Sequence, residues 1–505
     1  MARDNTHEFS RRELLRTTAG AAAAGWAAPR LCLGAVGVER PMMRKLGRTG
    51  FDVTTLGLGG QGSLQWTPGD VKPEQIILRA FELGVNYFDT SNVYGPSQMN
   101  YGKAFRALHL IPGTPGYDEK KRRSILLASK TLLRPAKGTA PRGMNSWTHG
   151  PPGSTAIDDL RRTLSLVFGD GRGGYPRGAY VDLFQLHDVK TFAEIDALRV
   201  GVDKPDPKAP FIGALAALRD YRDGTNLTGL NPKEEKLIRH IGFSGHYSAP
   251  VLIELMQRDK DNLLETMLVV INGNDRLHLN QQYNSIPVAA AKGLGVIAMK
   301  VFADGAMYTK EATWSRRPEQ VVRTVGSPAL PSRPLVQYAV STPGVSTAII
   351  GIGQIDNDPR RCQLRQNLSA AQIQPGSLSE SDRRAVEQKT AKVKNGRTNW
   401  FQAPAQPLTP PRELTVAQEV RDRQRVARIT WHTAYAGDEA IRRYEIRRDG
   451  RKVGQVEHRP QTSKTPFSFE DTVPDRAAHT YELLTVDAAG RTAASKELTI
   501  PPVGD

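Results

Sequence analysis

The stretch Gly84-Val85-Asn86-Tyr87-Phe88-Asp89-Thr90-Ser91-Asn92-Val93-Tyr94-Gly95 follows an amphipathic segment, Pro73–Leu83, whose apolar residues recur at helical spacing. Gly84 is a typical residue at the end of a helix. The apolar run Val85–Asp89 then predicts a short buried strand that ends in a carboxylate. A helix that leads directly into a buried strand is typical of folds with a parallel sheet.

The same alternation of apolar runs and helical patterns extends from Thr55 to Ile352. The predicted strands are Thr55–Gly59, Val85–Asp89, Ile125–Lys130, Val181–His187, His240–Ser244, Met267–Ile271, Gly295–Lys300 and Ser346–Gly351. They are dense in Val, Ile, Leu and Phe, as strands covered on both faces should be. The pattern predicts an α/β fold, a closed (β/α)₈ TIM barrel, over residues 43–395. The hairpin predicted over Met43–Val53 could plug its floor.

Three stretches interrupt the barrel pattern: Arg134–Gly153, Gly169–Gly178 and Thr191–Pro210. They are rich in Gly, Pro and charged residues. Long loops after barrel strands often shape substrate access, but such stretches can equally be solvated insertions. Both interpretations stay open at this point.

The chain changes character near its C-terminus, where the helical signal fades after Asn367 and residues 396–411 contain four prolines that predict a stiff linker. Residues 412–505 then contain short strand-like runs: Ala427–Trp431, Tyr444–Arg448, Lys452–Val456, Phe467–Phe469, Tyr481–Val486 and Glu497–Ile500. Regular short strands predict a small all-β sandwich that resembles a fibronectin type III domain. We expect Trp431 and Tyr481 to lie in its core.

The N-terminus carries Ser10-Arg11-Arg12-Glu13-Leu14-Leu15-Arg16 ahead of a small-residue apolar stretch, Thr17–Ala28. This pattern resembles a twin-arginine export signal over residues 1–35, with cleavage in or shortly after Gly25–Ala28. The apolar stretch is too short to predict a stable membrane span. We therefore expect the twin-arginine machinery as a partner and a periplasmic or cell-envelope location; if the signal does not function, the location is cytoplasmic.

The composition limits the other functional classes. The formal net charge of +17 comes from basic residues spread along the chain without a basic run, so nucleic acid is not an expected partner. Cys32 and Cys362 are the two cysteines, which excludes a disulfide framework and a cysteine metal site. We predict no metal.

Polar residues stand at the predicted carboxyl ends of consecutive strands: Asp89 and Tyr94, then Lys130, then His187. These ends meet at one rim of a barrel, where barrel enzymes place their catalytic groups. An ion pair between Asp89 and Lys130 is expected, because unpaired buried charges are costly. A cation beside Tyr94 is expected to lower the pKa of its hydroxyl, and His187 can donate a hydrogen bond to a carbonyl oxygen. The group suits carbonyl reduction, and no side chain supplies the hydride, so a nicotinamide is implied.

These residues occur in the order seen in the aldo-keto reductase superfamily. So do three further segments: Leu46-Gly47-Arg48-Thr49-Gly50, Gly242-Phe243-Ser244-Gly245-His246 and Gly295-Val296-Ile297-Ala298-Met299-Lys300. The chain resembles this superfamily from about Met43 to Leu368. The resemblance implies a catalytic tetrad of Asp89, Tyr94, Lys130 and His187. Tyr94 would be the general acid in reduction of an aldehyde or ketone and the general base in oxidation of the alcohol.

The resemblance also implies NADP as cofactor, with NAD possible. Ser244 would lie near the nicotinamide carboxamide, Lys300 would line the cofactor channel, and Gly351, Gln363 and Asn367 would lie along the pyrophosphate and adenosine end. Arg360 and Arg361 could meet a 2′-phosphate. The sequence departs from the family where Gly245 and His246 follow Ser244, since the family often has Asn there. His246 could donate a hydrogen bond to a residue of the site or be purely structural.

Three alternatives remain at this stage. The chain could be an exported nucleotide-binding sensor or surface protein that holds its cofactor tightly and turns over little. A metal-dependent barrel hydrolase is disfavoured, because the predicted rim lacks a cluster of metal ligands. The C-terminal sandwich could tether the protein to polysaccharide or another envelope component, in addition to catalysis on a small-molecule carbonyl or alcohol.

Overall fold

The computed structural model describes residues 40–144, 146–308 and 310–503, which lie in a compact unit spanning Val38–Asp505. The export signal predicted over residues 1–35 lies outside the described residues. Among the helices of the described part, none is both long and apolar enough to cross a membrane.

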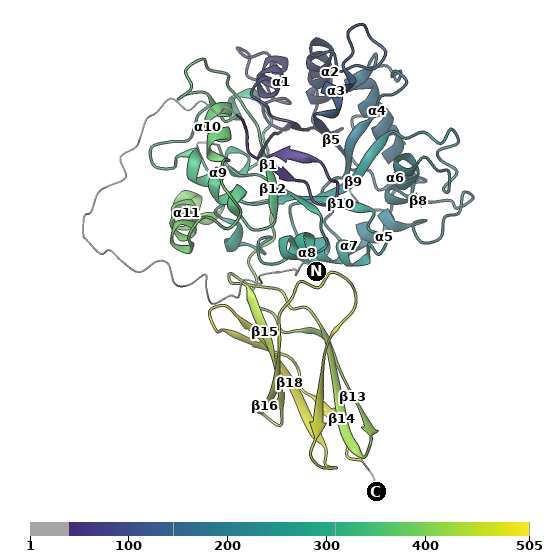
Figure 1. Ribbon diagram of the computed structural model, residues 1–505, viewed down its shortest axis with the longest axis vertical. Coiled ribbons are helices and arrows are strands. Elements are labelled where there is room, and N and C mark those ends of the chain that lie inside the picture. The colour runs from purple at the N-terminus through teal and green to yellow at the C-terminus, as the bar shows by residue number, and fades with distance from the viewer. Residues whose placement is uncertain (1–39, 145, 309, 504–505) are drawn as a thin grey trace, which may run out of the picture. The chain divides into compact units, whose positions relative to one another are not determined.

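Eight parallel strands close into a barrel in chain order (Figure 1). The strands are β3 (Leu56–Leu58), β4 (Tyr87–Asp89), β5 (Leu126–Thr131), β7 (Val181–Leu186), β9 (Ile238–Gly245), β10 (Leu264–Val270), β11 (Gly295–Met299) and β12 (Val345–Ile350). The predicted barrel and its eight strands are confirmed. Sequential order places the carboxyl ends of all eight strands at one rim.

Helices surround the barrel in Figure 1. They are α1 (Pro73–Glu82), α2 (Ser97–Ala107), α3 (Glu119–Arg123), α4 (Ala156–Phe168), α5 (Phe192–Arg199), α6 (Ala214–Asp223), α7 (Ala249–Arg258), α8 (Ser285–Ala291), α9 (Ser332–Ser341), α10 (Gln363–Ala370) and α11 (Glu380–Lys392). Helix α4 begins with a capping box in which Thr155 and Asp158 satisfy each other's backbone N–H groups.

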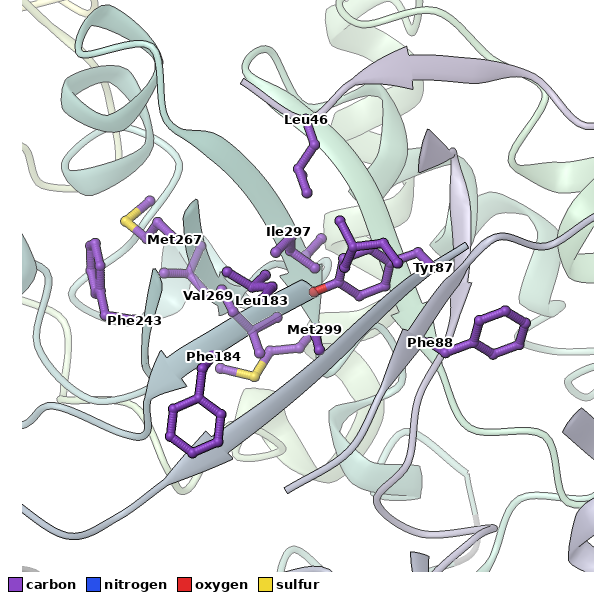
Figure 2. Packing of buried hydrophobic residues seen from close by; sticks show 14 of the residues in the cluster. Leu46, Tyr87, Phe88, Leu183, Phe184, Phe243, Met267, Val269, Ile297 and Met299 are labelled. Carbon is purple, nitrogen blue, oxygen red and sulfur yellow. The ribbon is translucent and has the colours of Figure 1, made fainter. Parts of the chain in front are cut away.

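The barrel interior is filled by side chains and its floor is closed by a hairpin. Strands β1 (Met43–Lys45) and β2 (Asp52–Thr54) pair antiparallel, and the turn between them brings Gly47 into a bridge with Leu294. A Cβ atom on Gly47 would lie 2.1 Å from the Gly295 nitrogen, so only glycine fits there. Figure 2 shows Leu46 pointing from this hairpin toward Ile297 in the buried cluster, which agrees with the predicted plug.

Two helices form where the sequence indicated irregular structure. Helix α5 begins inside the predicted insertion Thr191–Pro210, because Thr191 and Glu194 form a second capping box that stabilises its first turn. Helix α11 follows Asn367 although the helical signal fades there, since its exposed surface is almost wholly polar and it buries only Val386 and Thr390. Its N-terminus is capped by the Ser379 side chain, which accepts from the Asp382 N–H.

Residues 412–503 form two antiparallel sheets, as an all-β sandwich requires (Figure 1). One sheet contains β13 (Arg412–Arg421), β14 (Gln424–His432) and β17 (Phe467–Val473). The other contains β15 (Ile441–Arg448), β16 (Arg451–Glu457), β18 (His479–Asp487), β19 (Thr492–Ala494) and β20 (Leu498–Ile500). Trp431 and Tyr481 are fully buried in the cluster between the sheets, which confirms their prediction as core residues.

The segment predicted as a linker over residues 396–411 starts with residues that pack into the barrel. Phe401 belongs to the barrel core, and Asn399 and Gln402 are buried. The Asn399 side chain donates to Asn272, and the Gln402 side chain donates to Asp275 at 2.7 Å. Both acceptors lie in the segment that follows β10, so this part of the chain contributes to the rim formed by the carboxyl ends of the strands.

Candidate active site

Four predicted catalytic side chains converge because their strands are neighbours in the barrel. Asp89 is the last residue of β4, Lys130 lies in β5, and His187 directly follows β7. The pairing register aligns Asp89 with Ala128 and Lys130 with Gln185, so the three carboxyl ends lie side by side. Tyr94 is on the turn after β4, and its side chain returns over the same rim.

Asp89 and Lys130 form the predicted buried ion pair. The Lys130 Nζ donates to Asp89 Oδ2 at 2.6 Å and to the Thr90 carbonyl oxygen at 2.8 Å. Burial lowers the pKa of Lys130 and raises the pKa of Asp89, and the attraction between the two charges opposes both shifts. Both side chains are at most 1% exposed, so each charge depends on the other.

Tyr94 keeps its proton. Its ring is buried, and the Lys130 Nζ lies 4.8 Å from the ring centroid. Burial raises the pKa of Tyr94 well above its ordinary value, and the charges of Asp89, Asp188 and Asp304 raise it further. The sequence predicts a Tyr94 pKa below the ordinary value, and this is wrong, because burial and the nearby carboxylates outweigh the attraction of the Lys130 charge for the phenolate. A protonated phenol at neutral pH is suited to donate its proton.

His187 is neutral and held in one place. Burial lowers its pKa well below the ordinary value, and the charge of Lys130 lowers it further. Its ring stands edge-on to Tyr94 with the centroids 5.7 Å apart. The Arg134 guanidinium donates to the His187 and Asp188 carbonyl oxygens and forms a buried ion pair with Glu194. His187 can thus donate a hydrogen bond to a carbonyl oxygen, and so polarise the carbonyl group, without carrying a charge.

A cavity opens beside Tyr94 and Asp89 and runs toward the ends of β11 and β12. Lys300 and Gly351, both predicted as cofactor residues, line it. The Lys300 ammonium donates to the Gln61 side chain and lies 3.5 Å from Asp304. Other lining residues are Gly59, Gly62, Ser63, Met299, Val301, Phe302, Gly305, Ser315, Gln320, Val321, Val322, Ile349 and Ile350. The lining thus combines apolar side chains with glycines, hydroxyls and one buried lysine, which suits a ligand that has both apolar rings and polar groups.

The other predicted cofactor residues, Ser244, Gln363 and Asn367, have different surroundings from Lys300 and Gly351. Ser244 is fully buried, and its Oγ accepts from the Asp188 N–H at 2.9 Å. The Gln363 amide is occupied by main chain, since it accepts from Gly353 and Gln354 and donates to the Val322 and Thr324 carbonyls. It therefore ties the loop after β12 to the segment that covers the cavity.

Asn367 keeps one polar atom without a protein partner. Its side chain is 2% exposed, and Oδ1 forms no hydrogen bond within the described residues. An unpaired buried acceptor is costly and indicates a site for a ligand donor or water. Arg360 and Arg361, on the same stretch, are exposed and pair with Asp358 and Asp356.

The sequence reasoning missed an aromatic wall beside the tetrad. The His246 Nδ1–H donates to Asp188 Oδ1 at 2.7 Å, and the His246 ring lies 5.6 Å from Trp314 and 5.9 Å from Phe401. Trp314 in turn lies under the Lys300 ammonium, 4.6 Å from it. The residues come from three distant segments, so spacing along the chain carries no signal of their contact. The one sign in the sequence that His246 lies near the site is its position shortly after Ser244.

Within the described ranges, no group of three or more His, Cys, Asp or Glu side chains is arranged to hold a metal ion. The charged groups at the rim instead form pairs such as Lys130–Asp89 and His246–Asp188.

Residues 55–388 match the family model described as the aldo/keto reductase family. The chain belongs to this family. An uncharacterized oxidoreductase of Bacillus subtilis, YqkF, is 22% identical over 366 residues, which cover 69% of this chain and 96% of that protein. Family membership makes the barrel an oxidoreductase domain.

Two solved aldo-keto reductases show similar chains. The enzyme from Klebsiella pneumoniae, in complex with NADPH, is 16% identical with a TM-score of 0.41, covering 69% of this chain and 95% of its own. The enzyme from Bombyx mori, in complex with NADP, is 17% identical with a TM-score of 0.43, covering 70% and 95%.

Proposed function

We propose that this protein is an NADP-dependent reductase of aldehydes or ketones, or catalyses the reverse oxidation, with Tyr94 as the general acid and base. The observation that carries the proposal is a buried, protonated tyrosine at a cavity mouth, between a neutral histidine and a buried Lys130–Asp89 pair. Such a group supplies a proton and a hydrogen bond to an oxygen that gains negative charge.

Each residue of the tetrad has a separate task in this scheme. Tyr94 transfers its proton to the carbonyl oxygen, and His187 donates a hydrogen bond to the same oxygen. Lys130 places a positive charge over the Tyr94 ring, which stabilises the phenolate that remains after transfer. Asp89 keeps that charge in place. The nicotinamide of the reduced cofactor supplies the hydride.

The residues along the cavity fit a dinucleotide. Lys300 supplies a buried cation, and a Cβ atom on Gly351 would lie 3.2 Å from the Gln61 carbonyl oxygen, so a glycine keeps this wall open. The unpaired Asn367 Oδ1 would accept from an amino group at the far end. Arg360 and Arg361 are exposed guanidiniums that would bind a 2′-phosphate in exchange for their aspartate partners, which supports NADP over NAD.

The test is oxidation of NADPH with a panel of reactive aldehydes, quinones and sugars, together with fluorescence titration of NADPH and NADH. The proposal expects turnover with some carbonyl and tighter binding of NADPH than NADH. Cofactor binding without turnover across the panel would favour a sensor or surface protein that holds the nucleotide.

We also propose export by the twin-arginine route, to the periplasm or cell envelope, with a fibronectin type III-like sandwich at residues 412–505 that contacts envelope polysaccharide. The paired Arg11 and Arg12 before a weakly apolar stretch support export. Fractionation of the native protein tests it: the double substitution Arg11→Lys, Arg12→Lys should retain the protein in the cytoplasm. Recovery of intact Met1 peptides from wild type, in the cytoplasm alone, would contradict it.

A further inference from the structure

The two nitrogens of the His187 ring have different surroundings. Nδ1 lies 3.1 Å from the Ser91 Oγ, whereas Nε2 forms no hydrogen bond within the described part of the chain. A neutral imidazole carries one proton, on one nitrogen or the other, and only a protonated nitrogen can donate to a carbonyl oxygen. The partner of Nδ1 therefore determines whether Nε2 is a donor or an acceptor.

Ser91 is placed to control this choice. It follows β4 by two residues, is 1% exposed, and has a single proton with two acceptors within reach. One is the His187 Nδ1 at 3.1 Å, and the other is the Lys130 carbonyl oxygen at 3.4 Å. The destination of this one proton decides the tautomer of the ring.

The Lys130 carbonyl oxygen is the weaker of the two acceptors. It already accepts from the Asn92 backbone N–H at 3.1 Å, and it lies 3.2 Å from the Asn92 side-chain amide, whose two protons have closer acceptors. The Ser91 Oγ is also farther from this oxygen, at 3.4 Å, than from the His187 Nδ1, at 3.1 Å. The Ser91 proton consequently points to the His187 Nδ1.

The remaining contact of Ser91 agrees with this direction. The Val93 backbone N–H donates to Ser91 Oγ at 3.4 Å, so the hydroxyl oxygen already has a donor. Asn92 is in turn fixed by its amide, which also donates to the Asp159 carbonyl and to Thr163, both at 2.9 Å. The arrangement that sets the hydroxyl is therefore held by main chain and by helix α4.

We propose that Ser91 is a positioning residue that donates to His187 Nδ1 and so holds His187 as the Nε2–H tautomer. This rests on the proposed carbonyl reduction for its consequence, since an Nε2–H group is what a carbonyl oxygen accepts from. Without the Ser91 hydroxyl, the ring is free to carry its proton on Nδ1, and the fraction of molecules that can polarise the substrate falls.

The tautomer is measured by ¹⁵N NMR on full-length, deuterated protein with ¹⁵N-labelled histidine. Of the 10 histidines, His187 is identified by the signals that disappear in His187→Gln. Wild type should show a protonated Nε2 and an unprotonated Nδ1 for this residue. Ser91→Ala should shift both signals toward a mixture of tautomers, and Ser91→Thr, which keeps the hydroxyl, should restore them.

Kinetics with NADPH then link the tautomer to the reaction. Loss of one oriented hydrogen bond should lower kcat of Ser91→Ala about 10-fold, with NADPH affinity unchanged and partial rescue by Ser91→Thr. Ser165→Ala removes another buried serine hydroxyl, one that contacts Asp170 and Gly173 rather than the site, and should leave kcat near wild type.

An Nδ1–H signal for His187 in wild type overturns the inference, and so does an unchanged tautomer in Ser91→Ala. The wild-type spectrum decides even if Ser91→Ala fails to fold. A wild-type protein that shows the Nε2–H tautomer but reduces no carbonyl would leave the role of Ser91 intact and overturn the proposed function instead. A changed tautomer with unchanged kcat would refute the link to catalysis.

Discussion

The barrel rim and the C-terminal sandwich both contain buried tyrosines, but the hydroxyl groups of these tyrosines differ in their hydrogen bonding. In the sandwich, the Tyr481 hydroxyl donates to Asp471 at 2.7 Å, and the Tyr444 hydroxyl accepts from the Ala434 N–H at 3.1 Å. At the rim, no hydrogen bond to the Tyr94 hydroxyl occurs within the described residues, and the ring faces a cavity. The Tyr94 hydroxyl is thus available to a ligand in the cavity, whereas the two sandwich hydroxyls are occupied.

The ion pairs of the rim and of the sandwich also differ, in their exposure to solvent. The rim contains the Lys130–Asp89 and Arg134–Glu194 pairs, in which no side chain is more than 5% exposed. In the sandwich, a pair such as Arg491–Asp438 is half exposed. Buried pairs gain little net stability, because desolvation offsets their attraction. The Lys130–Asp89 pair beside Tyr94 is thus better explained by a need for fixed charge near a reacting group than by stability.

The largest expected effect comes from Tyr94→Phe, which removes the available proton and keeps the ring. Turnover should fall about 10²–10⁴-fold, because a positioned acid typically contributes this much, while NADPH affinity stays near wild type. The measurements are steady-state NADPH oxidation and fluorescence titration of the cofactor.

Tyr481→Phe is the matched control from the other region. It removes a hydroxyl from another buried tyrosine and should cost about 1 kcal/mol of unfolding free energy without affecting turnover. If Tyr94→Phe retains the wild-type rate, Tyr94 is not the acid and the contrast between the two regions has no functional meaning.

Lys130→Met should be the most destabilising change at the rim. It leaves Asp89 as a buried, unpaired carboxylate, and breaking a buried pair typically costs about 3–5 kcal/mol. Turnover should fall as well, since the cation over the Tyr94 ring is lost. Denaturant unfolding and NADPH oxidation measure the two effects.

The double substitution Lys130→Met with Asp89→Leu separates stability from catalysis. Replacing both charges by apolar groups should recover much of the unfolding free energy but none of the turnover. Recovery of turnover in this variant would show that the ion pair serves only the fold.

Much of the barrel was predictable, because buried parallel strands are continuous apolar runs and the polar residue that ends each run falls on the common rim. Asp89, Lys130 and His187 followed from that rule alone. The wall of His246, Trp314 and Phe401 did not, since it depends on how long segments after three strands fold back over the rim.

Two further features, the pKa of Tyr94 and helix α5, also differ from what the sequence predicts. The pKa of Tyr94 depends on the balance between burial and four nearby charges, and this balance is invisible before the distances are known. The charged residues and prolines around helix α5 predict an irregular insertion, although Thr191 and Glu194, which cap its first turn, are visible in the sequence.

Asp159 offers a smaller effect that depends on pH. Its carboxylate lies at the start of α4, where it accepts from the Thr131 and Thr148 hydroxyls, both at 2.6 Å, and burial raises its pKa to about 6. The folded state therefore binds a proton more tightly than the unfolded state, for which the pKa is near 3.8. Asp159 should favour folding below about pH 4, and this contribution should be lost as the pH rises through about 6.

The shift corresponds to about 3 kcal/mol of unfolding free energy across that range. Denaturant unfolding at pH 4 to 7 should show this extra loss in wild type and not in Asp159→Asn, which keeps the shape and, like the protonated carboxyl, has one acceptor oxygen and one donor group. Parallel pH profiles for the two proteins would show that the carboxylate is solvated in solution.

The smallest effect is expected from removal of the sandwich by truncation after Pro404. The truncated chain keeps all eight barrel strands and the Asn399–Gln402 segment that packs at the rim, so the Tyr94 site should remain complete and turnover should stay within about twofold of wild type. The truncation removes Glu439 and Ala436, which bond to Arg276 and Asn284 of the segment after β10, so some loss of barrel stability is expected from these broken contacts.

Circular dichroism, thermal unfolding and NADPH oxidation on the same preparation distinguish the loss of stability from a loss of turnover. A folded truncated barrel with normal cofactor affinity and no turnover would show that the sandwich helps to form the catalytic rim, and the two regions compared above would then have to be treated as one functional unit.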